Sequence, residues 1–300
     1  MSADLALAAA RFIHYTALTS LFGGLLFAFY AGFASDRVRK LVRGGSVLAA
    51  LAALASGVAW FLTTSATMAD ASIIELDRET LRFVLIETSF GQLWIVRLSL
   101  ISTIVLLAVR ISHPRQRRYM LTLLSAASLA SLAGTGHAQE GHGLTSVVHI
   151  FADAAHLLAA GAWLGAFLPL LLALRPKDDL ADAAAKPLRF SGVGSAAVAM
   201  LIGTGLINVL FISGFDYRGL ISPYGYALFL KLTLFAGMLV FAAANRFWLV
   251  PALQARIEFG LSAERMRKQL YHHILGEQLL GLGVLAAVSW LGILSPAPAM

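Results

Sequence analysis

Long apolar runs, separated by short polar stretches, make up most of this chain. Each run reaches the roughly 20 residues that a helix needs to cross a hydrocarbon core of about 30 Å. A segment inside lipid must pair its own backbone groups, and runs of this length do so as helices. The pattern therefore predicts an all-α polytopic membrane protein with about eight transmembrane helices, at residues 8–34, 46–69, 93–112, 119–138, 147–174, 190–214, 225–249 and 272–294.

The polar connections differ in charge, and this difference predicts the orientation. Most of the 23 lysines and arginines lie in alternate connections: Arg37, Arg39, Lys40 and Arg43; Arg110, Arg115, Arg117 and Arg118; Arg175, Lys177, Lys186 and Arg189; Arg246, Arg256, Arg265, Arg267 and Lys268. Basic loops stay preferentially in the cytoplasm. We therefore expect a multi-pass protein of the bacterial inner membrane with both termini periplasmic.

Composition supports a chain that is solvated mainly by lipid. It is 59% hydrophobic and only 13% charged, whereas a soluble domain carries about 25% charged residues. We expect a single membrane domain over residues 1–300, with the lipid bilayer as its partner. The net charge of +7 follows from basic cytoplasmic loops beside anionic lipid, so no nucleic-acid partner is expected.

An internal repeat relates the first predicted span to the fifth. His14 is followed nine residues later by Gly23, and His156 is followed nine residues later by Gly165. A second register agrees with the first, because Phe90-Gly91 precedes Arg97 by the spacing at which Tyr224-Gly225 precedes Lys231. These matches indicate a parallel 4+4 pseudo-repeat, with halves at 1–140 and 141–300, in which equivalent positions lie at equal depth.

Histidines gather in or beside the outward halves of three predicted spans: His14, His137, His142, His149 and His156. Neutral imidazole is the commonest metal ligand and suits copper, zinc or iron. His149, Asp153 and His156 share one helix face, with the deeper histidine about 10 Å further into the membrane. We expect a histidine ladder with His137 and His142 at its entrance and His14 opposite His156. Asp153 would orient a ring nitrogen or bind Cu(II) directly.

A structural role remains open for each of these side chains. Each histidine alone can be a packing residue that is hydrogen-bonded between helices. Polar groups inside spans are expensive and tend to mark functional paths, so the clustering favours a site.

Other side chains leave a similar choice open. Arg97 and Lys231 can extend toward lipid phosphates or anchor an anionic group. Glu277 can join its helix to Asn245 or mark a cytoplasmic exit. Met68 can supply a thioether to Cu(I) or make an ordinary apolar contact.

Several classes of chemistry lack support in the chain. There is no cysteine, which excludes disulfides and thiolate metal sites. Phosphate-loop, GxSxG and HExxH motifs are also absent from the sequence, so we expect a non-enzymatic protein.

Several motifs together resemble one known family. They are RFIHYTAL near the start, GTGHA at 134–138, AHLLAAGAWLGAFLPL at 155–170, RFSGVG at 189–194, SPYGYALFLKL at 222–232, AANRF at 243–247 and LGEQLLGLGVLAAVSWLG at 275–292. In this order they resemble the copper resistance protein D (CopD) family over essentially the whole chain. The resemblance implies an inner-membrane protein of copper homeostasis associated with a separate periplasmic CopC-like copper-binding protein. It carries over most directly to His14, His137, His149 and His156, whereas His142 lies just outside the matching motifs.

Three hypotheses follow. In the first, the protein is a copper permease that takes copper from the periplasmic side through the histidine ladder. In the second, it is a b-type haem protein, because two histidines at equal depth are also what bis-histidine ligation requires. In the third, it is a scaffold or sensor whose histidines only pack.

Overall fold

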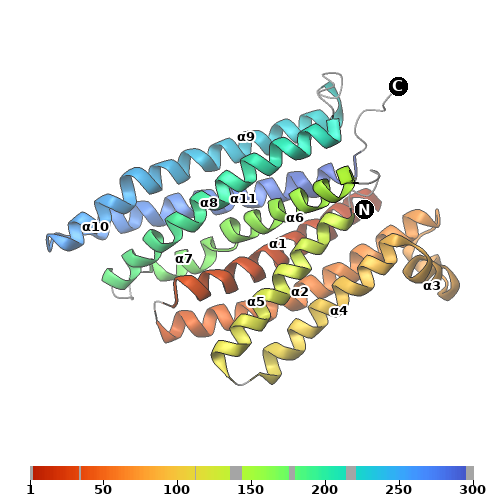
Figure 1. The fold of residues 1–300 in the computed structure, drawn as a ribbon, viewed down its shortest axis with the longest axis horizontal. Coiled ribbons are helices and arrows are strands. Elements are labelled where there is room, and N and C mark those ends of the chain that lie inside the picture. Colours follow the sequence, from red (N-terminus) through yellow and green to blue (C-terminus); the bar gives the residue numbers. More distant parts are fainter. Residues whose placement is uncertain are drawn as a thin grey trace.

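The computed structural model describes residues 3–33, 35–111, 113–135, 144–175, 180–213 and 221–294, and these residues form helices and connecting turns. Figure 1 shows the long helices side by side in one bundle. The elements are α1 (Ala3–Tyr30), α2 (Asp36–Met68), η1 (Ile73–Glu75), α3 (Arg78–Glu87), α4 (Ser89–Arg110), α5 (Pro114–Ala130), η2 (Ser131–Thr135), α6 (Leu144–Leu164), α7 (Phe167–Ala173), α8 (Leu180–Ser213), α9 (Pro223–Ala244), η5 (Asn245–Leu249), α10 (Val250–Glu258) and α11 (Glu264–Leu291).

The polytopic all-α prediction is confirmed, with one difference in the count of spans. Within the described residues, 7 helical segments are long and apolar enough to cross a membrane. The expected span at 119–138 forms α5, whose 17 residues begin with the polar stretch PRQRRY, and continues into the 3-10 helix η2. It packs against α1, α4 and α6 inside the bundle.

The span expected at 147–174 is interrupted near its middle. It forms α6 and then α7, with a break at Gly165 and Ala166. Pro169 explains the break, because proline has no N–H to donate to the carbonyl four residues earlier and its ring collides with that carbonyl.

Two helices form the centre of the bundle. In α1, 61% of the most apolar window lies inside the molecule, and in the segment of α6 and α7 the share is 56%. One hydrophobic core lies among α1, α2, α4 and α5, with α6 side chains packed against it. Another lies among α6, α7, α8, α9 and α11 and also includes Phe27 of α1. α1 and α6 thus contribute to both cores.

Glycines bring α1 and α6 into backbone contact. A Cβ added at Gly23 would overlap with the carbonyl oxygen of Gly161, and a Cβ added at Gly165 would overlap with that of Thr19. Only residues without a side chain allow helices to approach so closely. Thr19 and Gly161 are separated by the same 142 positions as Gly23 and Gly165, so the contact is reciprocal, as at an interface related by a twofold axis.

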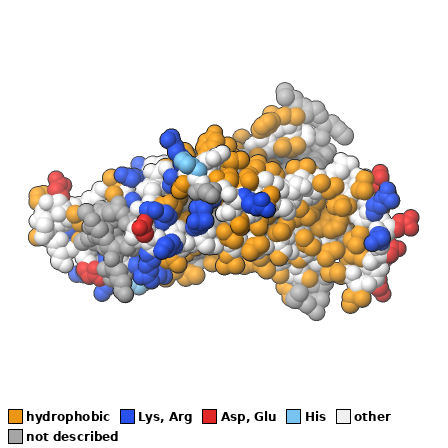
Figure 2. All heavy atoms as spheres, turned by 90° about the horizontal axis from the view of Figure 1, so that it is seen from below, with side chains coloured by type: hydrophobic (Ala, Val, Ile, Leu, Met, Phe, Trp, Pro, Cys, Tyr) orange, Lys and Arg blue, Asp and Glu red, His pale blue; other side chains and the backbone are white. Residues whose placement is uncertain are grey.

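The two ends of the bundle differ in charge. The start of α1 and the end of α11 lie at the same end (Figure 1), where Arg11 donates to the carbonyl of Gly292. Figure 2 shows a wide hydrophobic band beside a region rich in Lys and Arg toward the α10 end. Basic side chains there bind the last carbonyls of helices: Lys186 and Arg189 both reach the oxygen of Ala31. Cations at a helix C-terminus also interact favourably with its dipole.

Candidate functional site

His14 lies in the middle of the first half. Its side chain is 0% exposed, and its Nδ1 lies 2.9 Å from the carbonyl oxygen of Ala53 and 3.2 Å from Oγ of Ser56, both on α2. A carbonyl oxygen only accepts, so this network assigns the ring proton to Nδ1. The lone pair is then on Nε2, which is buried and has no hydrogen-bond partner among the described residues.

Aromatic rings and one cation enclose this histidine. Trp60 meets it edge-on at 5.7 Å and Trp94 stacks at 6.4 Å between ring centroids. Arg97 is 0% exposed. It lies 4.3 Å from the centroid of Trp94 and donates to the hydroxyl and carbonyl oxygens of Ser131. Arg97 therefore does not extend toward lipid phosphates: it is buried, and its Nε and Nη2 donate to Ser131, while its buried Nη1 has no hydrogen-bond partner among the described residues.

His156 makes a similar hydrogen bond from α6. Its Nδ1 lies 2.9 Å from Oγ1 of Thr204 on α8. The Thr204 hydroxyl donates to the carbonyl of Met200 at 2.6 Å, so its oxygen accepts from the ring. The proton is again assigned to Nδ1, and Nε2 carries the lone pair that a metal would need.

Asp153 lies one turn from His156 on α6. Asn208 on α8 donates to its carboxylate at 3.2 Å. His149, one turn further toward the start of α6, is 7% exposed, and His149 and Lys231 both act electrostatically on Asp153. We refer to His149, Asp153 and His156, with Thr204, Asn208 and Lys231 around them, as the α6 cluster.

The structure does not unite His14 with the α6 cluster. The ring of His14 contacts α2 and α4, whereas that of His156 contacts α8. Seven residues of helix separate His149 from His156 by about 10 Å, whereas two nitrogens bound to one ion lie at most about 4 Å apart. Accordingly, the described residues contain no group of three or more His, Cys, Asp or Glu positioned around one ion. This differs from the expected facing pair, because the two rings contact different helices.

The remaining predicted residues occupy varied places. His137 and His142 lie outside the described residues. Met68 is the last residue of α2, and its side chain is 54% exposed. Glu277 is 2% exposed and accepts a hydrogen bond from Asn245, which joins α11 to the end of α9 as the structural alternative predicted.

Contacts of the two histidines match in detail. Ser56 is followed by Gly57 and Thr204 by Gly205, and a Cβ added at either glycine would lie against Cε1 of the corresponding histidine, at 3.1 and 3.8 Å. The hydroxyl partners were not predicted from the sequence. The recurrence of a hydroxyl residue before glycine in the second span of each half was the signal that could have found them.

The helices that carry Arg97 and Lys231 also match. α4 and α9 have 22 residues each. Each begins after a hydroxyl residue that accepts from a glycine N–H, Thr88 from Gly91 and Ser222 from Gly225. Such a cap fixes where a helix begins.

The fold is that of a polytopic helical membrane protein, and His14 and His149 are buried inside its helix bundle. The copper resistance protein D-like N-terminal domain family matches residues 1–147, and the copper resistance protein D family matches residues 186–291. The chain belongs to the copper resistance protein D family.

Individual relatives agree with this assignment. Copper resistance protein D of Pseudomonas syringae pv. tomato is 33% identical over 96% of both chains. Inner membrane protein YebZ of Escherichia coli (strain K12) is 33% identical over 82% of this chain and 85% of its own length. Copper transport protein CutJ of Bacillus subtilis (strain 168) is 29% identical over 93% of this chain and 50% of its own length. No solved structure matches the chain.

Proposed function

We propose that this protein carries copper across the bacterial inner membrane and takes it up from the periplasmic side through the α6 cluster. The observation that supports this most directly is the pairing of His156 Nδ1 with Thr204, which leaves Nε2 as the metal-binding atom. Metal-binding histidines characteristically donate their other ring nitrogen to such an acceptor. Copper is the cargo in this proposal, and the names of the protein's relatives support that choice.

Within the cluster, copper would pass between neighbouring ligand pairs. His149 with Asp153, and Asp153 with His156, are each about one helical turn apart, which suits a shared ion. Asn208 orients the Asp153 carboxylate from α8. Imidazole suits copper, and a carboxylate oxygen contributes in the Cu(II) state.

The entrance and orientation complete the proposal. His137 and His142 would receive copper on the periplasmic side, from a separate CopC-like protein. The basic residues at the α10 end would face the cytoplasm, which leaves both termini periplasmic. An inner-membrane relative supports the location.

His14 would provide a separate position in the first half. We propose that residues 1–140 and 141–300 are duplicated halves, supported by the matched contacts of His14 and His156. A basic side chain acts on both histidines, Arg97 on His14 and Lys231 on His156. The α6 cluster differs in having the carboxylate of Asp153, which attracts a metal ion, whereas the equivalent position of the first half is Arg11. The α6 cluster is therefore the main site.

The proposal of haem binding gains no support from these contacts. Bis-histidine ligation needs two rings directed at one iron, whereas His14 and His156 contact different helices. We expect the absorption spectrum of the purified protein to lack a Soret band.

Copper binding by single variants tests the proposal. Copper affinity is measured on protein purified into lipid nanodiscs. His149→Ala and His156→Ala should each lower it by about tenfold or more. His272→Ala is the control, because that ring bonds to the carbonyl of Lys268 outside the cluster. Copper uptake by intact cells should fall in parallel. Unchanged affinity and uptake in both cluster variants would favour the scaffold hypothesis.

A further inference from the structure

A cavity of about 490 Å³ lies between α8, α9 and α11, away from the α6 cluster. This volume is in the range of sites for small organic ligands. Lining residues on α8, among them Ser195, Ala199 and Ile202, are exposed on the outside of the helix bundle. The cavity therefore opens sideways between helices, at a surface that lipid covers, and its occupant would arrive from the bilayer.

One wall of the cavity carries a buried polar pair. Asn245 and Glu277 are 8% and 2% exposed, and Nδ2 of Asn245 donates to Glu277. Oδ1 of Asn245 is also buried and has no hydrogen-bond partner among the described residues. A buried acceptor without a donor is destabilising, so this wall is complementary to a ligand hydroxyl.

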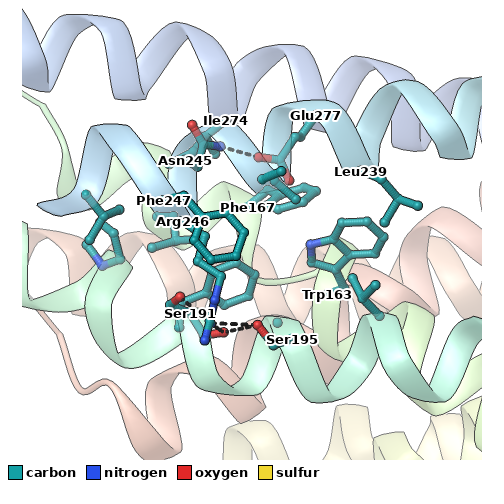
Figure 3. A pocket seen from close by; sticks show the side chains of 18 of the residues that line it. Trp163, Phe167, Ser191, Ser195, Leu239, Asn245, Arg246, Phe247, Ile274 and Glu277 are labelled. Atoms are coloured by element: carbon teal, nitrogen blue, oxygen red, sulfur yellow. Dashed lines mark hydrogen bonds between the residues drawn. The ribbon is translucent and has the colours of Figure 1, made fainter.

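The opposite wall carries hydrogen-bond donors. Arg246 extends from η5 across the cavity to α8, as Figure 3 shows. There its Nη1 lies 2.8 Å from the carbonyl oxygen and 2.7 Å from Oγ of Ser191, and 2.7 Å from Oγ of Ser195. A guanidinium has five N–H donors, and these bonds come from Nη1, so Nε and Nη2 keep donors for a ligand oxygen.

Aromatic side chains lie between these walls. Trp163, Phe167, Phe190 and Phe247 line the cavity, and Figure 3 shows Trp163 and Phe167 beside the polar groups. The π-helical segment η5 places the successive residues Asn245 and Arg246 on different walls. Local π-helices of this kind are frequent at functional sites.

We propose that this cavity binds the ring of a membrane-soluble quinol, with its apolar tail leaving between α8 and α9. One ring hydroxyl donates to Oδ1 of Asn245, and the oxygen across the ring accepts from Arg246. An acyl chain alone would leave Asn245 unsatisfied. The oxidised quinone has no hydroxyl to donate, so the site prefers the reduced form. This binding goes beyond copper handling and is independent of the α6 cluster.

Binding of decylubiquinol and decylubiquinone to the protein in nanodiscs tests the proposal, with quenching of tryptophan fluorescence as the readout. The reduced form should bind saturably and about tenfold more tightly, the equivalent of one buried hydrogen bond. Ala199→Phe fills the mouth and should weaken quinol binding by at least about tenfold. Ala196→Phe is the matched control, because Ala196 is equally exposed on α8 but does not line the cavity.

A further variant tests the proposed hydrogen bond. Asn245→Leu should abolish the preference for the reduced form. This change also removes the hydrogen-bond partner of buried Glu277 and so can disturb folding. The variants at Ala199 and Ala196 leave that pair intact, so they test the proposal separately from folding. Equal binding by the two alanine variants, equal affinity for both redox forms, or displacement of decylubiquinol by palmitate at equal concentration would overturn the proposal.

Discussion

At the scale of single residues, hydrogen bonding decides what each buried histidine can do. His14 and His156 could be selected from the sequence, because imidazoles inside apolar spans are rare and costly. The acceptors Ala53 and Thr204 could not, because they lie 39 and 48 positions away along the chain. Periodicity within one helix does not reveal which side chain of another helix it meets. It therefore predicted that His149, Asp153 and His156 lie on one helix, but not the direction in which His14 points.

The hydroxyl of Thr204 offers a sharp test at this scale. Thr204→Val keeps the shape of the side chain but removes the acceptor of His156 Nδ1, so the ring loses its fixed tautomer. Copper affinity should fall by about 10- to 100-fold, as for other residues that orient metal ligands. Titration of copper into the nanodisc-embedded protein measures the change.

Thr204→Ser is the matched control, since it retains the hydroxyl and should bind copper nearly as well as the wild type. If valine and serine at this position bind copper alike, the hydrogen bond does not support the ligand.

At the scale of elements, apolar length predicted most spans, but charge did not predict where the helices begin. α2, α8 and α11 each begin within a stretch predicted to be a basic loop. The fourth span differs further, because arginines replace apolar residues over the first turns of α5. These arginines are used inside the fold: Arg118 donates to the carbonyl of Ala28 at the end of α1. A basic residue that was counted as part of a loop can thus also cap a neighbouring helix. The sequence pattern does not distinguish these two roles.

The contact between α1 and α6 leads to a prediction about stability. Gly23→Ala places a methyl group against the backbone of α6, and overpacking of this kind costs about 1–3 kcal/mol. The unfolding temperature in detergent should fall. At the adjacent Gly24 an added Cβ would have its nearest neighbour at 3.8 Å, so Gly24→Ala should leave stability nearly unchanged. Equal effects of the two substitutions would contradict the close approach of α1 and α6.

At the scale of the whole molecule, the proposed duplication relates depth in one half to depth in the other. Ser99 on α4 and Thr233 on α9 follow Arg97 and Lys231 by the same two residues, and both are exposed on the outside of the bundle. The chain contains no cysteine, so one introduced cysteine can carry a single spin label.

Spin labels at Ser99→Cys and Thr233→Cys should report the same depth in the bilayer. Accessibility to oxygen and to a water-soluble nickel complex measures that depth. Val109→Cys, near the other end of α4 and 71% exposed, should differ from both. A depth difference between the two equivalent labels of more than one helical turn, about 5 Å, would exclude a parallel repeat.

The proposed orientation has its own test. A fluorescent reporter that matures only in the cytoplasm should give no signal when it is fused after residue 300. The same reporter inserted at 259–263, in the turn between α10 and α11, should give a strong signal, because basic residues surround that turn. A signal from the reporter after residue 300 and none from the reporter at 259–263 would show that the orientation is the opposite of the one proposed.

Backbone contact at Gly23 and Gly165 also limits how the molecule can move. Where two helices touch without side chains between them, no rotamer change can relieve a sliding motion, so we expect α1 and α6 to move together. Only 6% of the most apolar window of the α9–α10 segment lies inside the molecule, so the outer helices have more freedom. Rocking of one half against the other would separate the glycines. Hinge motion of the outer helices about a fixed centre is another established form of conformational change. It would leave the glycines of α1 and α6 in contact while a path for the ion opens.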